Sequence, residues 1–147
     1  MADRMIDPTN NEPQGEITDE LKAVVQAVLN EAVSKMEAGE DIIPFTGLAV
    51  KENLFIETHP GDDAETCFAL ARHEVEGARG ATAYAFCYDG YLETDEGVKD
   101  CIIAEGGLPG APEAYAFGYI YDEDGINKEI IYIGPAPNFM EGLKLEL

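Results

Sequence analysis

The stretch that decides the fold is Ala83-Tyr84-Ala85-Phe86-Cys87-Tyr88, in which small and aromatic side chains alternate. Alternation with a period of two predicts a β-strand whose two faces differ in character. The pattern recurs at Ala114-Tyr115-Ala116-Phe117, and each copy is followed by a second apolar run, at 101–106 and 129–134. We therefore interpret residues 82–134 as a β-hairpin that occurs twice.

One local feature of the first copy needs an interpretation of its own. Asp89-Gly90 has the composition of a tight hairpin turn, yet the second copy runs Tyr119-Ile120-Tyr121 through the matching place. A β-bulge in one long strand over 82–94 accommodates both copies, so we predict a bulge at Asp89-Gly90.

The first half of the chain predicts two helices separated by two strands. The first helix begins after Thr18 and ends at Gly39, since its apolar residues recur at intervals of three and four. Strands are expected at 45–50 and 54–58, joined as a hairpin. A second helix is expected over 63–76 with Asp62 as its cap. Its inner face comprises Ala64, Cys67, Phe68, Ala71 and Val75.

Together these elements predict an α+β fold. We expect a mainly antiparallel, twisted sheet of about six to seven strands with two helices packed on it, in the order α-β-β-α-β-β-β-β. Residues 1–16 are polar and lack periodicity, which predicts a mobile N-terminal arm. Residues 17–147 then form a single domain.

Charge excludes several classes of function. The 147 residues include 30 Asp or Glu and 9 Lys or Arg, a formal charge of −21. A nucleic-acid backbone or an anionic membrane needs clustered positive charge, so we expect neither as a partner. No uninterrupted apolar run approaches the ~18 residues of a membrane helix. Cys67, Cys87 and Cys101 lie among apolar neighbours, which predicts buried thiols in a reducing cytoplasm.

The aromatic residues of the two copies form the first candidate site. We expect them to share one face of the sheet, and that face is either the core or a surface that binds a ligand or a partner. We favour the core, because aromatic stripes usually pack inward. An exposed face, together with the alternating Leu143, Leu145 and Leu147, would favour a homo-oligomer. The tyrosines concerned are Tyr84, Tyr88, Tyr115, Tyr119 and Tyr121.

Signals for catalysis are weak. His59, Asp89 and Asp100 are the candidate acid–base residues, and Asp100 is expected to be half-buried because it lies in phase with apolar neighbours. No pair of closely spaced histidines, phosphate-binding loop or serine nucleophile motif is present. We therefore expect no cofactor and identify no metal-ligand set.

Two function hypotheses follow. The first is a non-enzymatic binding or regulatory protein, in which the acidic surface or the aromatic sheet face contacts a basic protein partner. The alternative is a small hydrolase or isomerase that uses His59 with Asp89 and Asp100, with or without a divalent metal. Acidity that serves solubility alone is a third reading.

Overall fold

The computed structural model describes most of the chain. The described residues are 18–50, 53–60, 63–77, 80–111, 113–127 and 129–139. The predicted arm over 1–16 and the predicted tail with Leu143, Leu145 and Leu147 lie outside them.

Helix α1 (Asp19–Glu37) forms where the apolar periodicity predicts it. The hydroxyl oxygen of Thr18 accepts a hydrogen bond from the amide of Leu21 at 3.2 Å, which satisfies one of the first-turn donors. Gly39 follows the helix with a φ of 81°, a conformation that favours glycine. One apolar stripe of the helix is buried: Leu21, Val24, Val25, Val28, Leu29, Ala32 and Val33.

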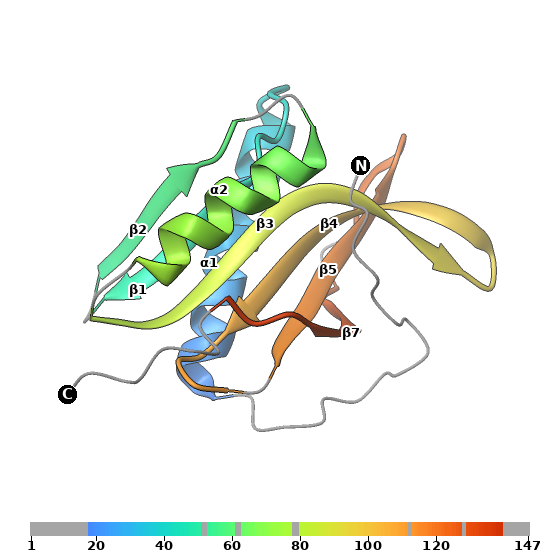
Figure 1. The fold of residues 1–147 in the computed structure, drawn as a ribbon. Helices are drawn as coiled ribbons and strands as arrows, with labels where there is room; N and C mark the ends of the chain where they lie inside the picture. The colour runs from blue at the N-terminus through green and yellow to red at the C-terminus, as the bar shows by residue number, and fades with distance from the viewer. Residues whose placement is uncertain are drawn as a thin grey trace.

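The strands form one antiparallel sheet in the order β2-β1-β3-β4-β5-β6, with β7 also paired to β5 (Figure 1). The sheet and the two helices confirm the α+β class with a twisted antiparallel sheet. The strands are β1 (Phe45–Val50), β2 (Asn53–Thr58), β3 (Ala81–Thr94), β4 (Gly97–Gly107), β5 (Ala114–Asp122), β6 (Gly125–Ile126) and β7 (Ile131–Ala136).

Helix α2 (Ala64–Glu76) lies across the face of the sheet opposite to α1 (Figure 1). Its cap is Asp63, whose carboxylate accepts a hydrogen bond from the amide of Thr66 at 2.8 Å. The prediction of Asp62 as the cap was one residue early, because either aspartate fits the sequence pattern; Asp62 itself lies outside the described residues. Cys67, Ala71 and Val75 are buried, as expected for the inner face, whereas the side chains of Ala64 and Phe68 are not described.

The aromatic residues of the two copies lie on opposite faces of the sheet, so the prediction of one shared aromatic face was wrong. Tyr84 lies opposite Gly107 across the β3–β4 pair, whereas Tyr115 lies opposite Gly106 across the β4–β5 pair. Neighbouring residues of a strand point to opposite faces, so this shift of one residue reverses the second copy. Tyr84, Phe86 and Tyr88 face α2, and Tyr115 and Tyr119 face α1.

The predicted bulge at Asp89-Gly90 is also wrong, although β3 is the single long strand expected. The β3–β4 register runs without a shift from Tyr84 to Thr94, with Asp89 opposite Ile102 and Gly90 opposite Cys101. Register shifts occur instead at Ala49/Val50 and at Ala116/Phe117. A Cβ at Gly90 would lie 3.1 Å from Cδ1 of Ile103, which is the flexible end of that side chain.

Close approach of α1 to the sheet depends on glycine at Gly106. A Cβ at this position would lie 2.6 Å from Cγ2 of Val25 and 2.9 Å from Cδ1 of Leu21. Valine has little rotameric freedom in a helix, so Val25 cannot easily move away. The branched stripe of α1 therefore packs directly onto sheet backbone.

We predict that Gly106→Ala lowers the free energy of unfolding by about 1–3 kcal/mol, through overpacking between α1 and β4. Denaturant unfolding followed by circular dichroism measures the change. Gly77→Ala is the matched control, because the added Cβ would make only an ordinary 3.4 Å contact with the carbonyl oxygen of His73. Equal stability of the two variants would contradict the packing assigned to Gly106.

Candidate protein-interaction site

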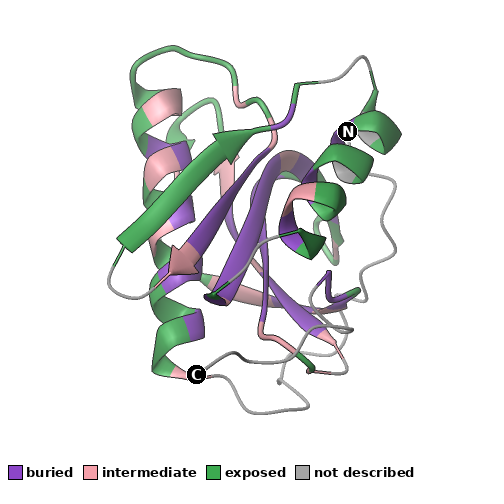
Figure 2. Cartoon of the chain, turned by 60° about the vertical axis from the view of Figure 1, so that its left-hand side comes forward, coloured by how far each residue is buried: buried purple, intermediate pink, exposed green. Residues whose placement is uncertain are grey.

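Strand β2 forms an exposed edge of the sheet. All six of its residues are exposed, and it forms a continuous exposed band beside the buried residues of β1 and β3 (Figure 2). Leu54, Phe55 and Ile56 are large apolar residues with 38%, 56% and 41% of their surface exposed. Natural edge strands are usually protected by lysine, proline, bulges or a covering element. The sequence of β2, with Glu57 as its only charge, has no lysine or proline.

The backbone of β2 has a defined inner and outer side. The amide of His59 donates to the carbonyl oxygen of Pro44 at 2.7 Å, directly beyond the paired residues Phe45 and Thr58. Hydrogen-bonded pairs alternate along an antiparallel ladder, so Glu57, Phe55 and Asn53 also bond to β1. The amide and carbonyl groups of Leu54, Ile56 and Thr58 therefore point outward. Among the described residues, no strand pairs with this outer side.

Two hollows flank the edge strand, one on each face of the sheet. On the α2 side, a groove of about 690 Å³ has walls that include Leu48, Val50, Phe55 and Glu57 of the hairpin, with His73 and Glu74 of α2. On the α1 side, a hollow of about 200 Å³ is lined by Leu54 together with Val24 and Ala27 of α1, among others. A strand added beside β2 would place alternate side chains on these two sides.

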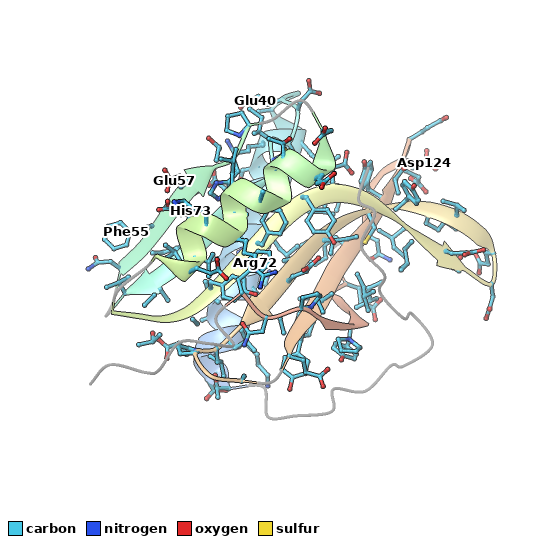
Figure 3. All side chains as sticks on the ribbon, in the orientation of Figure 1. Glu40, Phe55, Glu57, Arg72, His73 and Asp124 are labelled. Carbon is cyan, nitrogen blue, oxygen red and sulfur yellow. The ribbon has the colours of Figure 1, made fainter. Side chains whose placement is uncertain are left out.

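The groove on the α2 side is acidic where β2 and α2 face each other. Glu57 and His73 come from the strand and the helix, and Phe55 lies at the outer margin (Figure 3). A hydrogen bond to Glu57 raises the pKa of Glu74, and desolvation and the charge of Glu57 raise it further. The charge of His73 acts in the opposite direction and lowers the pKa of Glu74. Arg72 does not neutralise this pair, because its guanidinium bonds the carboxylate of Glu76 at 3.1 Å.

The other margin of the sheet is less open. Strand β6 has only two residues, and β7 carries Pro135, which lacks a backbone donor. The residues of β7 are buried or half-buried. Among the described strands, β2 is thus the one that combines an open backbone with large exposed apolar side chains.

The three predicted acid–base residues do not form one site. Nε2 of His59 lies 2.9 Å from the hydroxyl oxygen of Thr46, on the α2 side of the sheet, and burial lowers the pKa of His59. Asp89 lies on the α1 side, where it accepts a hydrogen bond from the hydroxyl of Tyr121 at 2.6 Å. Asp100 is exposed, not half-buried as expected. It lies three residues after the start of β4, close to the turn of the β3–β4 hairpin, and this end of the hairpin extends beyond the helices (Figure 1).

The five candidate tyrosines are largely internal. Tyr84 and Tyr88 are fully buried, Tyr115 and Tyr119 are buried beneath α1, and Tyr121 is half-buried. Their hydroxyls contact residues of the domain itself, as in the bond from Tyr88 to Glu105 at 2.5 Å and from Gln26 to Tyr119 at 2.6 Å. These contacts give the tyrosines a packing role.

Sequence reasoning missed two features. Glu105 is only 1% exposed, and its place in phase with Cys101 and Ile103 was the signal that could have identified a buried carboxyl group. The free edge of β2 was missed because the alternating Leu54, Ile56 and Thr58 predict a strand but not its position in the sheet. Strand order depends on contacts between segments distant in the sequence.

Several further findings bear on function. Within the described part of the chain, no group of three or more His, Cys, Asp or Glu side chains is arranged to hold a metal ion. None of the helices there has the length and apolar character needed to cross a membrane. Comparisons of the chain with protein-family models, with curated proteins and with solved structures give no match.

The Asp89–Tyr121 contact generates a prediction on pH and stability. Burial raises the pKa of Asp89 above 3.8 and the charge of Asp100 acts in the same direction, while the Tyr121 hydrogen bond partly opposes them. The stability linked to this group is therefore present below pH 3.8 and is lost as pH rises through the folded-state pKa. Asp89→Asn should stabilise the protein at pH 7, by at most about 1 kcal/mol because solvent screens this half-exposed group.

Thermal unfolding at pH 3 to 8 measures this difference, which should vanish at the acidic end. Asp95→Asn, at an exposed turn, removes the same charge and serves as the control. Equal effects of the two substitutions at every pH would contradict a specific role for the environment of Asp89.

Proposed function

We propose that this protein is a non-enzymatic binding module that receives an extended segment of a basic protein at the outer edge of β2. The observation that carries the proposal is the outward backbone of Leu54, Ile56 and Thr58 on a strand whose residues are all exposed and include large apolar side chains. Addition of a strand to such an edge is a recurring mode of protein recognition, in which backbone hydrogen bonds supply much of the affinity.

Charge favours a basic partner over a second copy of the chain. Two copies of −21 repel each other, whereas a positively charged partner is attracted and its encounter is accelerated. The same repulsion keeps the apolar edges of separate copies apart, so an edge that would otherwise promote aggregation stays available. The carboxylates of Glu57 and Glu74, which line the groove, also favour a positively charged partner.

Cytoplasmic location forms part of the proposal. Cys67, Cys87 and Cys101 are buried thiols. Burial raises the pKa of Cys101 to about 12 and that of Cys87 still further, which keeps these two thiols protonated and unreactive. A reducing compartment suits such residues. The alternative of a hydrolase or isomerase gains no support from the separation of His59 from Asp89.

The proposal predicts that an alternating lysine–valine peptide binds, and that Ile56→Pro weakens binding by roughly tenfold or more, which corresponds to about 1.4 kcal/mol. Proline at this position removes an outward donor but no bond to β1, so the fold is retained. Fluorescence anisotropy with labelled peptide measures the affinity, and circular dichroism verifies folding. Ile56→Lys, which retains the outward amide but protects the edge by charge, is a second variant.

The control peptide has the same residues with N-methyl groups on every lysine and every valine, so it retains its charge but has no backbone donor on either edge to form a ladder. Binding of the unmodified peptide should exceed that of the control and should weaken as the salt concentration is raised, because salt screens exposed charges. Equal binding of both peptides, or affinity unaffected by salt and by Ile56→Pro, would overturn the proposal. Association of the protein with itself at low salt would also overturn the assignment of a basic partner.

A further inference from the structure

The two faces of β2 differ in chemistry, and this difference determines which side chains an added strand should carry. Phe55 and Glu57 face α2, whereas Leu54 and Ile56 lie on the α1 side with Leu54 close to Val28 above Gly47. A residue of an added strand lies on the same face as the β2 residue directly opposite. Residues opposite Glu57 and Phe55 therefore both enter the α2 side, and the residue between them enters the α1 side.

We infer that the β2 edge selects a three-residue pattern in the partner segment: an arginine or lysine opposite Glu57, an apolar residue opposite Ile56, and an apolar residue opposite Phe55. This inference rests on the proposed function and specifies the partner that the same site accepts. The basic side chain lies in the groove between β2 and α2, with its cationic head between the carboxylates of Glu57 and Glu74.

Position supports the assignment of the basic residue. Directly opposed residues of neighbouring strands have Cβ atoms roughly 4.5–5.5 Å apart, so the side chain opposite Glu57 begins beside that carboxylate. Glu57 and Glu74 are within hydrogen-bonding reach of each other, so a cation that reaches one reaches both. Arginine suits this pair best, since its planar guanidinium presents several donors to more than one carboxylate oxygen.

Charge balance at the same two carboxylates supports this assignment. The contact with Glu57 raises the pKa of Glu74, which reflects the cost of holding two carboxyl groups together. A guanidinium placed between them removes this cost. His73, the nearest basic neighbour, is exposed, and Arg72 is bonded to Glu76. Among the described residues of β1, β2 and α2, no other side chain supplies a positive charge to the groove.

The two apolar residues of the proposed pattern are assigned from the apolar side chains that line each face of β2. Phe55, Leu48 and Val50 form the apolar part of the groove on the α2 side. An apolar residue two positions from the arginine contacts Phe55 there. Leu54 and Ile56 offer an exposed apolar surface on the other face, which suits an apolar residue between the two.

Two peptides of identical composition test the pattern. Both have a host of alternating threonine and valine; one has the central order arginine-valine-phenylalanine and the other valine-arginine-phenylalanine. In the second order arginine and phenylalanine project to opposite faces, and no register or direction brings both into the groove. We expect the first peptide to bind roughly tenfold more tightly than the second, by anisotropy at low salt.

Protein variants locate the effect. Glu57→Gln combined with Glu74→Gln should remove the preference for the first peptide. Glu65→Gln combined with Glu93→Gln removes the same amount of charge, from one helix and one strand position outside the groove, and should retain the preference. Equal affinity for the two peptides, with binding of both peptides abolished by Ile56→Pro, would overturn the inference and leave edge binding intact. If neither peptide binds, edge binding itself fails. A preference that persists in the Glu57/Glu74 variant would overturn the assignment of these carboxylates.

Discussion

The backbone of β2 makes hydrogen bonds on one side only, and the proposed function depends on this asymmetry. Glu57, Phe55 and Asn53 bond inward to β1, which leaves the polar groups of Leu54, Ile56 and Thr58 to solvent. In most sheets such an edge is short, charged or covered. Here it is six residues long and exposes Leu54, Phe55 and Ile56 at its centre.

Packing of the two helices explains why the edge remains exposed. The stripe of α1 lies directly on the backbone at Gly106 and Gly47, where glycine allows the helix to come close. Helix α2 lies on the opposite face. The two helices thus bury both faces of the central strands, whereas β2 lies outside the region that they cover and is exposed (Figure 2). Burial at the centre and exposure at the edge are two results of the same arrangement.

Prediction from sequence succeeded where local periodicity determines structure and failed where distant segments meet. The stripe from Leu21 to Val33 identified α1 and its buried face. The repeated Ala-Tyr-Ala-Phe pattern identified β3 and β5 but not their relative faces, because a shift of one residue across β4 reverses them. The candidate site was not predicted for the same reason: local pattern does not state that β2 ends the sheet. The net charge of −21 follows from composition alone. It favours a basic partner at a defined place only when the exposed edge of β2 is known.

Amide hydrogen exchange of the single residues of β2 tests the central claim most directly. In the protein alone, the amides of Leu54, Ile56 and Thr58 should exchange rapidly, and those of Phe55 and Glu57 should be protected by their bonds to β1. Addition of the arginine-valine-phenylalanine peptide should slow exchange at Leu54, Ile56 and Thr58 and leave most other strands unchanged. Peptide binding without protection of these three amides would contradict the account.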